Sequence, residues 1–133
     1  IDNTSEGLLD VMVSGFITTG TSPTANRVIE LWAIAARDDT NFPTVFDGTA
    51  SAETIASVNI KNGICKFIVS LLVTSSSDTT YHFSGISLAS AFGGLLPPKC
   101  VLFCTQSSGA SLNASSAQHR IRLQPIYRRI DSV

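Results

Sequence analysis

The stretch QHRIRLQPIYRR, residues 118–129, alternates between apolar and polar side chains. In an extended chain Ile121 and Leu123 fall on one side, while Arg120 and Arg122 fall on the other. A period of two residues is typical of a β-strand that turns one face toward a core. The stretch therefore predicts a strand with an apolar face and a basic face.

Pro125 lies inside this predicted strand. Proline cannot donate a ladder hydrogen bond, so we expect the strand at a sheet edge or a bulge. Shorter stretches with similar patterns precede it, and turn-forming residues separate them. We expect these further strands at 8–17, 27–37, 55–60, 64–74, 79–86 and 99–106.

Asn62-Gly63 separates two of the predicted strands, 55–60 and 64–74. This dipeptide is the strongest short signal for a tight hairpin, so it predicts that the two strands pair. A helix is the rival interpretation of 27–37 because alanine is frequent there. One helical turn is expected at 87–92, before the glycine pair at 93–94.

Seven or eight short strands with no long helix predict an all-β fold, an antiparallel β-sandwich of jelly-roll type. Long loops such as 38–52 suit crossovers between two sheets. No internal repeat or linker divides the chain. We expect one domain over 1–133, with extended arms at 1–7 and 128–133.

Charged residues make up 14% of the 133 residues, well below the roughly 25% of typical soluble domains. The surface is rich in serine and threonine instead. Such a surface is poorly protected against association, which predicts that neighbouring subunits cover much of it. The alternative is a monomer with a hydroxyl-rich exterior.

The longest apolar runs, such as 67–73, are far shorter than the ~20 residues of a membrane helix. Residues 1–10 lack the basic and apolar regions of a signal peptide. Three cysteines cannot all pair within one chain. We therefore expect no membrane partner, and buried thiols in a reducing compartment.

The sequence offers few candidate residues for catalysis or metal binding. The two histidines, His82 and His119, lie in no nucleophile–base motif. Cys65, Cys100 and Cys104 lack the close spacing of a metal site. We expect a protein that is not an enzyme and holds no metal or cofactor. A hydrolase that uses one of the histidines is the competing hypothesis.

Basic residues gather at the C-terminal end, namely Arg120, Arg122, Arg128 and Arg129. Such a cluster can contact nucleic acid phosphates. The formal net charge is -1, however, and no aromatic stacking face accompanies the arginines. Arginine is also favoured in protein interfaces, so we predict protein contact rather than nucleic acid binding.

Two groups of segments carry a family resemblance. The first group is SPTAN at 22–26, IELW at 29–32 and TNFPTVFDGT at 40–49; the second is FSGIS at 83–87, FGGLLP at 92–97 and the segment 113–127. Together they resemble the capsid cement (decoration) proteins of tailed bacteriophages, of the jelly-roll type described for a Bordetella phage. The resemblance spans roughly residues 8–127.

This resemblance implies a virion structural protein that is made in the bacterial cytoplasm and sits on the outer surface of the capsid. It would clamp neighbouring subunits of the major capsid protein, as a homodimer that gains avidity from two contacts. It implies no catalytic residues. The candidate contact regions are 1–7, the loop 38–52 and the C-terminal end. Their candidate contact residues are Asp38, Asp39, Phe42, Phe46, Arg120, Arg122, Arg128 and Arg129.

Two binding alternatives remain beside the cement protein. A carbohydrate- or receptor-binding sandwich would need Trp32, Tyr81 and Tyr127 to form an exposed aromatic platform. A tail or neck protein of a phage with a similar sandwich is the other alternative.

Overall fold

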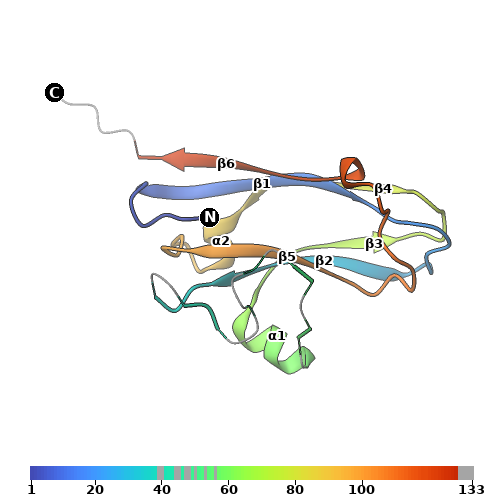
Figure 1. Cartoon of the computed structure of the whole chain (residues 1–133). Helices are drawn as coiled ribbons and strands as arrows, with labels where there is room; N and C mark the ends of the chain where they lie inside the picture. Colours follow the sequence, from blue (N-terminus) through green and yellow to red (C-terminus); the bar gives the residue numbers. More distant parts are fainter. Residues whose placement is uncertain are drawn as a thin grey trace.

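The computed structural model describes residues 1–38, 41–43, 46, 49, 51–52, 54–55 and 57–128. In this part of the chain, six strands and three short helices form (Figure 1). They are β1 (Leu8–Thr18), β2 (Arg27–Ala35), α1 (Val58–Ile64), β3 (Lys66–Val73), β4 (Thr80–Ser87), α2 (Leu88–Ala91), β5 (Cys100–Gln106), η1 (Ser116–Gln118) and β6 (His119–Tyr127).

The strands form two antiparallel sheets, in the orders β4-β1-β6 and β3-β2-β5. The two sheets lie one above the other (Figure 1). The core between them takes side chains from both sheets, including Val11, Val13, Ile17, Ile29, Leu31, Ile68, Val73 and Phe83. The predicted all-β antiparallel fold is confirmed, with six strands in the described residues where seven or eight were expected.

The predicted hairpin around Asn62-Gly63 is wrong. Residues 58–64 form helix α1, and Ser57 caps it by accepting a hydrogen bond from the N–H of Ile60. Strand β3 pairs with the distant strand β2, from Arg27↔Val73 to Ala33↔Lys66. Long-range sheet pairing and a helix cap therefore outweigh the local turn preference of the dipeptide.

The predicted strand at 55–60 is wrong as well, because residues 58–60 belong to α1. The remaining predicted strands are present, with ends shifted by a few residues at most. The segment 27–37 forms a strand rather than a helix, and its alternation separates two environments. Ile29, Leu31 and Ala33 enter the core between the sheets. Trp32 and Ile34 belong to a second, smaller cluster on the opposite face of β2. Strand β2 is central in its sheet and is covered on both faces.

The predicted edge position of the Pro125 strand is confirmed, because β6 is the outer neighbour of β1. At the other end of the chain, Asp2 forms an antiparallel bridge with Lys99. Ile1 and Cys100 exchange two hydrogen bonds, 2.9 and 3.0 Å long. The beginning of the segment 1–7 is thus held beside β5. Of the segment 128–133, only Arg128 lies within the described residues.

No helix in the described residues has the length and apolar character needed to cross a membrane.

Candidate partner-binding surface

Strand β6 is the least covered strand that the structure describes. His119 is partly buried, and every following residue of the strand is exposed. Ile121 and Leu123 are 41% and 44% exposed. Their side chains nevertheless turn to the inner face of the sheet, because Leu123 pairs with the buried core residue Val13 and Ile121 lies two residues before Leu123. An apolar face left in contact with water is characteristic of an interaction site.

The sequence of β1 explains how β6 is held. Gly15 pairs with Ile121, and a Cβ atom at Gly15 would overlap with the carbonyl oxygen of Arg120. The same Cβ atom would lie 3.0 Å from the ring of Phe83 on the other neighbouring strand. Glycine thus allows β6 to approach β1 closely and fixes the position of the arginine face.

A small hollow of about 200 Å³ opens between the outer strands β5 and β6. Its lining is largely apolar and consists of Ile17, Cys104, Leu112, His119, Arg120 and Ile121. Strands β5 and β6 are the outer strands of their sheets at this side of the sandwich. The hollow is therefore a place where the core between the sheets reaches solvent.

His119 has a structural role at one end of this hollow. Its Nδ1 accepts a hydrogen bond from the N–H of Thr18 at 3.4 Å, and its Nε2 lies 2.7 Å from the carbonyl oxygen of Asn113. Because Nδ1 is the acceptor in the first contact, Nε2 is the nitrogen that donates to Asn113. Both ring nitrogens are engaged, whereas a catalytic base needs a free lone pair that faces a substrate.

The arginines occupy the outer face of the same strand. Arg120 and Arg122 pair with Phe16 and Ser14 of β1 and are exposed. Among the described residues, neither guanidinium forms an ion pair. Arg128 is exposed just after the strand ends, and Arg129 lies outside the described residues. The sequence correctly placed the two strand arginines on one face.

The candidate residues of the loop 38–52 lie elsewhere. Asp38 accepts hydrogen bonds from the backbone and side chain of Asn41, and Asp39 is outside the described residues. Phe42 and Phe46 stack edge to face at 4.9 Å and pack against the cluster of Trp32. Helix α1 and β6 lie on opposite sides of the two sheets (Figure 1), and Ile64 of α1 packs against the same cluster. The structure therefore places the predicted contact residues on two separate surfaces.

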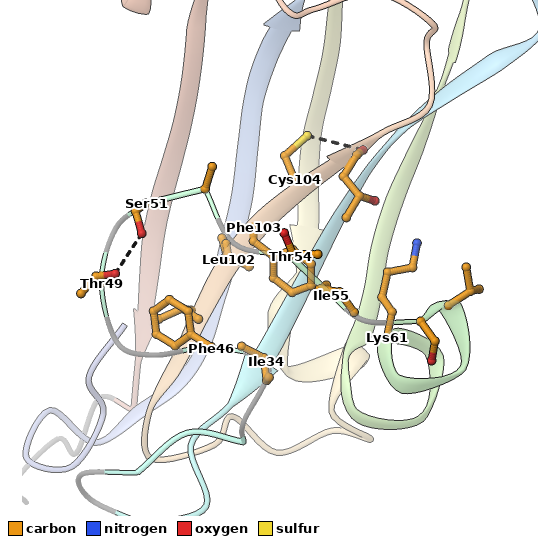
Figure 2. A pocket seen from close by; sticks show the side chains of 15 residues that line it. Ile34, Phe46, Thr49, Ser51, Thr54, Ile55, Lys61, Leu102, Phe103 and Cys104 are labelled. Carbon is orange, nitrogen blue, oxygen red and sulfur yellow. Dashed lines mark hydrogen bonds between the residues drawn. The ribbon is translucent and has the colours of Figure 1, made fainter.

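A larger pocket of about 910 Å³ lies on the loop side of the molecule (Figure 2). Ile34, Val101 and Phe103 form its apolar floor on β2 and β5, and Lys61 of α1 borders it. Lys61 forms an ion pair with Glu30, in which Nζ lies 2.7 Å from Oε2. The charge that borders the pocket is thus neutralised inside the protein.

Glu30 is the centre of a polar network that the sequence did not predict. Its Oε2 atom accepts hydrogen bonds from Lys61, from Nε1 of Trp32 at 3.0 Å and from Thr105 at 3.3 Å. The bond from Lys61 lowers the pKa of Glu30; burial opposes this effect, and Trp32 adds to it. Trp32 is a sequence neighbour of Glu30, but no local signal could reveal Lys61 and Thr105 as further partners, because they lie 31 and 75 residues away.

The surroundings of the three thiols disfavour the thiolate form, which is the nucleophilic form of cysteine. Cys65 and Cys100 are buried, and burial raises the pKa of each. Cys104 is exposed to solvent, and it borders both the small hollow beside β6 and the larger pocket. The atoms packed around its sulfur, and then the nearby Glu30, still raise its pKa to about 11. In the part of the chain that the structure describes, no cluster of metal-ligating side chains occurs.

The aromatic residues of the sugar-binding alternative are not brought together. Trp32 is only 7% exposed and lies on β2 under Lys61. Tyr81 and Tyr127 belong to the other sheet, on β4 and β6. These positions are incompatible with one exposed platform, since a platform needs accessible rings on a common face.

Comparison with known proteins adds no relative to these observations: no family model, no curated protein and no solved structure matches the chain.

Proposed function

We propose that this protein is a virion structural protein that binds the outside of a phage capsid and clamps neighbouring major capsid subunits. The observation that carries the proposal is β6, a free edge strand with exposed apolar residues on one face and arginines on the other. Folded proteins normally cover or disable such an edge, because it offers unpaired N–H and C=O groups. A neighbouring subunit would supply that cover.

The arrangement of the two surfaces supports a clamp. Strand β6 and helix α1 lie on opposite sides of the sandwich (Figure 1), and Phe42 and Phe46 pack against the same cluster as Ile64 of α1. A small domain with two separate contact surfaces can join two partners, and a homodimer would gain further avidity. The jelly-roll topology and the cement role are part of this proposal, and the segments at 22–49 and 83–127 support them through their resemblance to cement proteins.

Co-sedimentation of the purified chain with phage capsids, before and after their maturation, tests the proposal. We expect the chain to sediment with mature shells, and Leu123→Asp to reduce this binding, because a charge would enter the apolar face of β6. Leu95→Asp is the matched control: Leu95 is 80% exposed and lies outside β6. Equal binding by both variants would contradict the role of β6.

Shell strength provides the second measurement. Capsids that lack the protein should expand normally but break at lower temperature or force than capsids that carry it. Equal strength with and without the protein would reject the clamp. Sedimentation with tails or necks instead of shells would identify the alternative phage partner.

A further inference from the structure

We propose that the free edge of β6 binds an extended segment of its partner in which acidic side chains alternate with apolar ones. The inference rests on the proposed function and deepens it, because it specifies the chemistry of the capsid segment. In this binding mode the partner adds one strand to the sheet β4-β1-β6. Backbone hydrogen bonds supply affinity and alternate side chains supply specificity.

The backbone of β6 limits where the added strand can pair. Only β1 pairs with β6 in the described part of the chain, so the other edge is open. Pro125 has no N–H to donate, and it interrupts any regular ladder on that edge. We therefore place the added strand along residues 119–124.

The inner face requires apolar partners. Ile121 and Leu123 are exposed there, and the hollow next to Ile121 is lined by Leu112 and Cys104. An added strand would place every second side chain over this gap between β5 and β6. Valine or leucine at those positions would cover apolar surface that is now in contact with water.

The outer face requires acidic partners. Arg120 and Arg122 alternate with the two apolar residues along β6, and neither has an ion pair in the described residues. The side chains of the added strand that turn outward would lie beside these guanidinium groups. Carboxylates fit this position because they pair with arginine through two hydrogen bonds, and opposite charges on neighbouring strands stabilise a sheet.

The same charges disfavour the two other occupants of this edge. If β6 of a second copy paired here, the arginines of both copies would share one face of the continuous sheet and repel one another. A nucleic acid would satisfy Arg120 and Arg122, but its charged backbone has no apolar groups to cover Ile121 and Leu123. An acidic and apolar segment of a protein satisfies both faces.

Fluorescence anisotropy with labelled synthetic peptides tests the inference. The probe is a peptide of about six residues, matched to residues 119–124 of β6, in which glutamate alternates with valine. The controls are a lysine–valine peptide, a glutamate–valine peptide with a central proline, and a single-stranded DNA oligonucleotide. We expect the glutamate–valine peptide to bind at least about tenfold more tightly than each control, a preference typical of a matched charge pair.

Charge exchange makes the test specific. The double variant Arg120→Glu, Arg122→Glu should lose the glutamate–valine peptide and gain the lysine–valine peptide. Its folding is checked by circular dichroism, and Leu95→Asp should bind like the unmodified chain. Equal binding of both peptides, tighter binding of DNA, or self-association through β6 in light scattering would each overturn the inference.

Capsid binding separates this inference from the proposed function. If capsids bind the unmodified chain and the double variant equally, the clamp stands and the β6 strand addition is rejected. If the chain binds no capsid, the proposed function is rejected, and because the inference rests on it, the capsid origin of the segment is rejected as well. The expected result is capsid binding that the double variant loses at least about tenfold.

Discussion

The Nζ atom of Lys61 lies 2.7 Å from Oε2 of Glu30, and this ion pair joins helix α1 to strand β2. The same ammonium lies 4.4 Å from the ring centroid of Trp32. Thr105 of β5 also donates to Glu30. No residue of α1 is buried. We therefore infer that the ion pair between Lys61 and Glu30 is a main contact that holds the helix against the sheet.

Replacing Glu30 with glutamine should therefore destabilise the protein. The amide cannot form the ion pair, and it leaves Lys61 without its charged partner. We expect a loss of about 1–3 kcal/mol in the free energy of unfolding, the usual cost of a hydrogen bond to a charged group. Chemical denaturation followed by tryptophan fluorescence measures it. Asp2→Asn, which removes the more exposed pair with Lys99, is the control and should change stability little.

The contribution of Glu30 should depend on pH in a defined direction. Its pKa in the folded protein lies below the ordinary value, because of the bond from Lys61. The folded state thus binds the proton more weakly than the unfolded state, and stability falls as the pH decreases. The contribution is complete above the ordinary glutamate pKa of about 4.3 and disappears as the pH falls through the lower, folded value.

The measurement is the difference in unfolding free energy between the unmodified chain and Glu30→Gln, followed from neutral pH to acid. We expect the difference to shrink below about pH 4. For Asp10, burial is the largest single influence and raises the pKa, but the hydrogen bonds from Ser87 and from the N–H groups of Ala89, Val11 and Leu88 together lower it. This second acid effect is common to both proteins and cancels in the difference. A constant difference over the whole range would contradict the assignment.

Alternation was enough to find most of the fold. In 8–17, 27–37 and 118–129 the period of two residues identifies the strands, and in β2 it also identifies which residues enter each of two clusters. A side chain's preference for one face is a local property, so a single sequence reveals it. The same alternation correctly predicts that Arg120 and Arg122 share a face of β6, the strand for which partner binding is proposed.

The sequence alone could not predict which distant segments pair with each other. Asn62-Gly63 predicts a hairpin, but residues 58–64 form helix α1, and β3 pairs with the distant strand β2. The capping signal of Ser57 was present and competed with the turn signal. The contact between Glu30 and Lys61 likewise depends on where α1 settles on the sheet. Neither charge has a sequence neighbour that reveals its partner.

Shortening an apolar side chain to alanine should destabilise the protein more in the core than on the inner face of β6. Ile29→Ala removes a fully buried side chain from the core between the sheets. We expect it to cost about 2–5 kcal/mol. Leu123→Ala removes a side chain that is 44% exposed and should cost less than about 1 kcal/mol by area. Denaturant titrations compare the two, and an equal loss would show that the inner face of β6 is part of the core rather than a docking surface.

Replacing glycine with alanine should lower the stability of the protein at position 15 and raise it at position 63. Gly15→Ala places a methyl group against the backbone of Arg120, so β1 and β6 must separate. Overpacking of this kind costs about 1–3 kcal/mol, and it should also weaken capsid binding because β6 is displaced. Gly63→Ala meets no atom within 4 Å and lies inside α1, where alanine is preferred by roughly 0.5–1 kcal/mol. Thermal unfolding should therefore shift downward for Gly15→Ala and upward for Gly63→Ala. If Gly15→Ala leaves the unfolding temperature unchanged, β6 can move away from β1 at no cost in stability. The position of the arginine face would then not be fixed by Gly15, which contradicts the basis of the proposed strand addition.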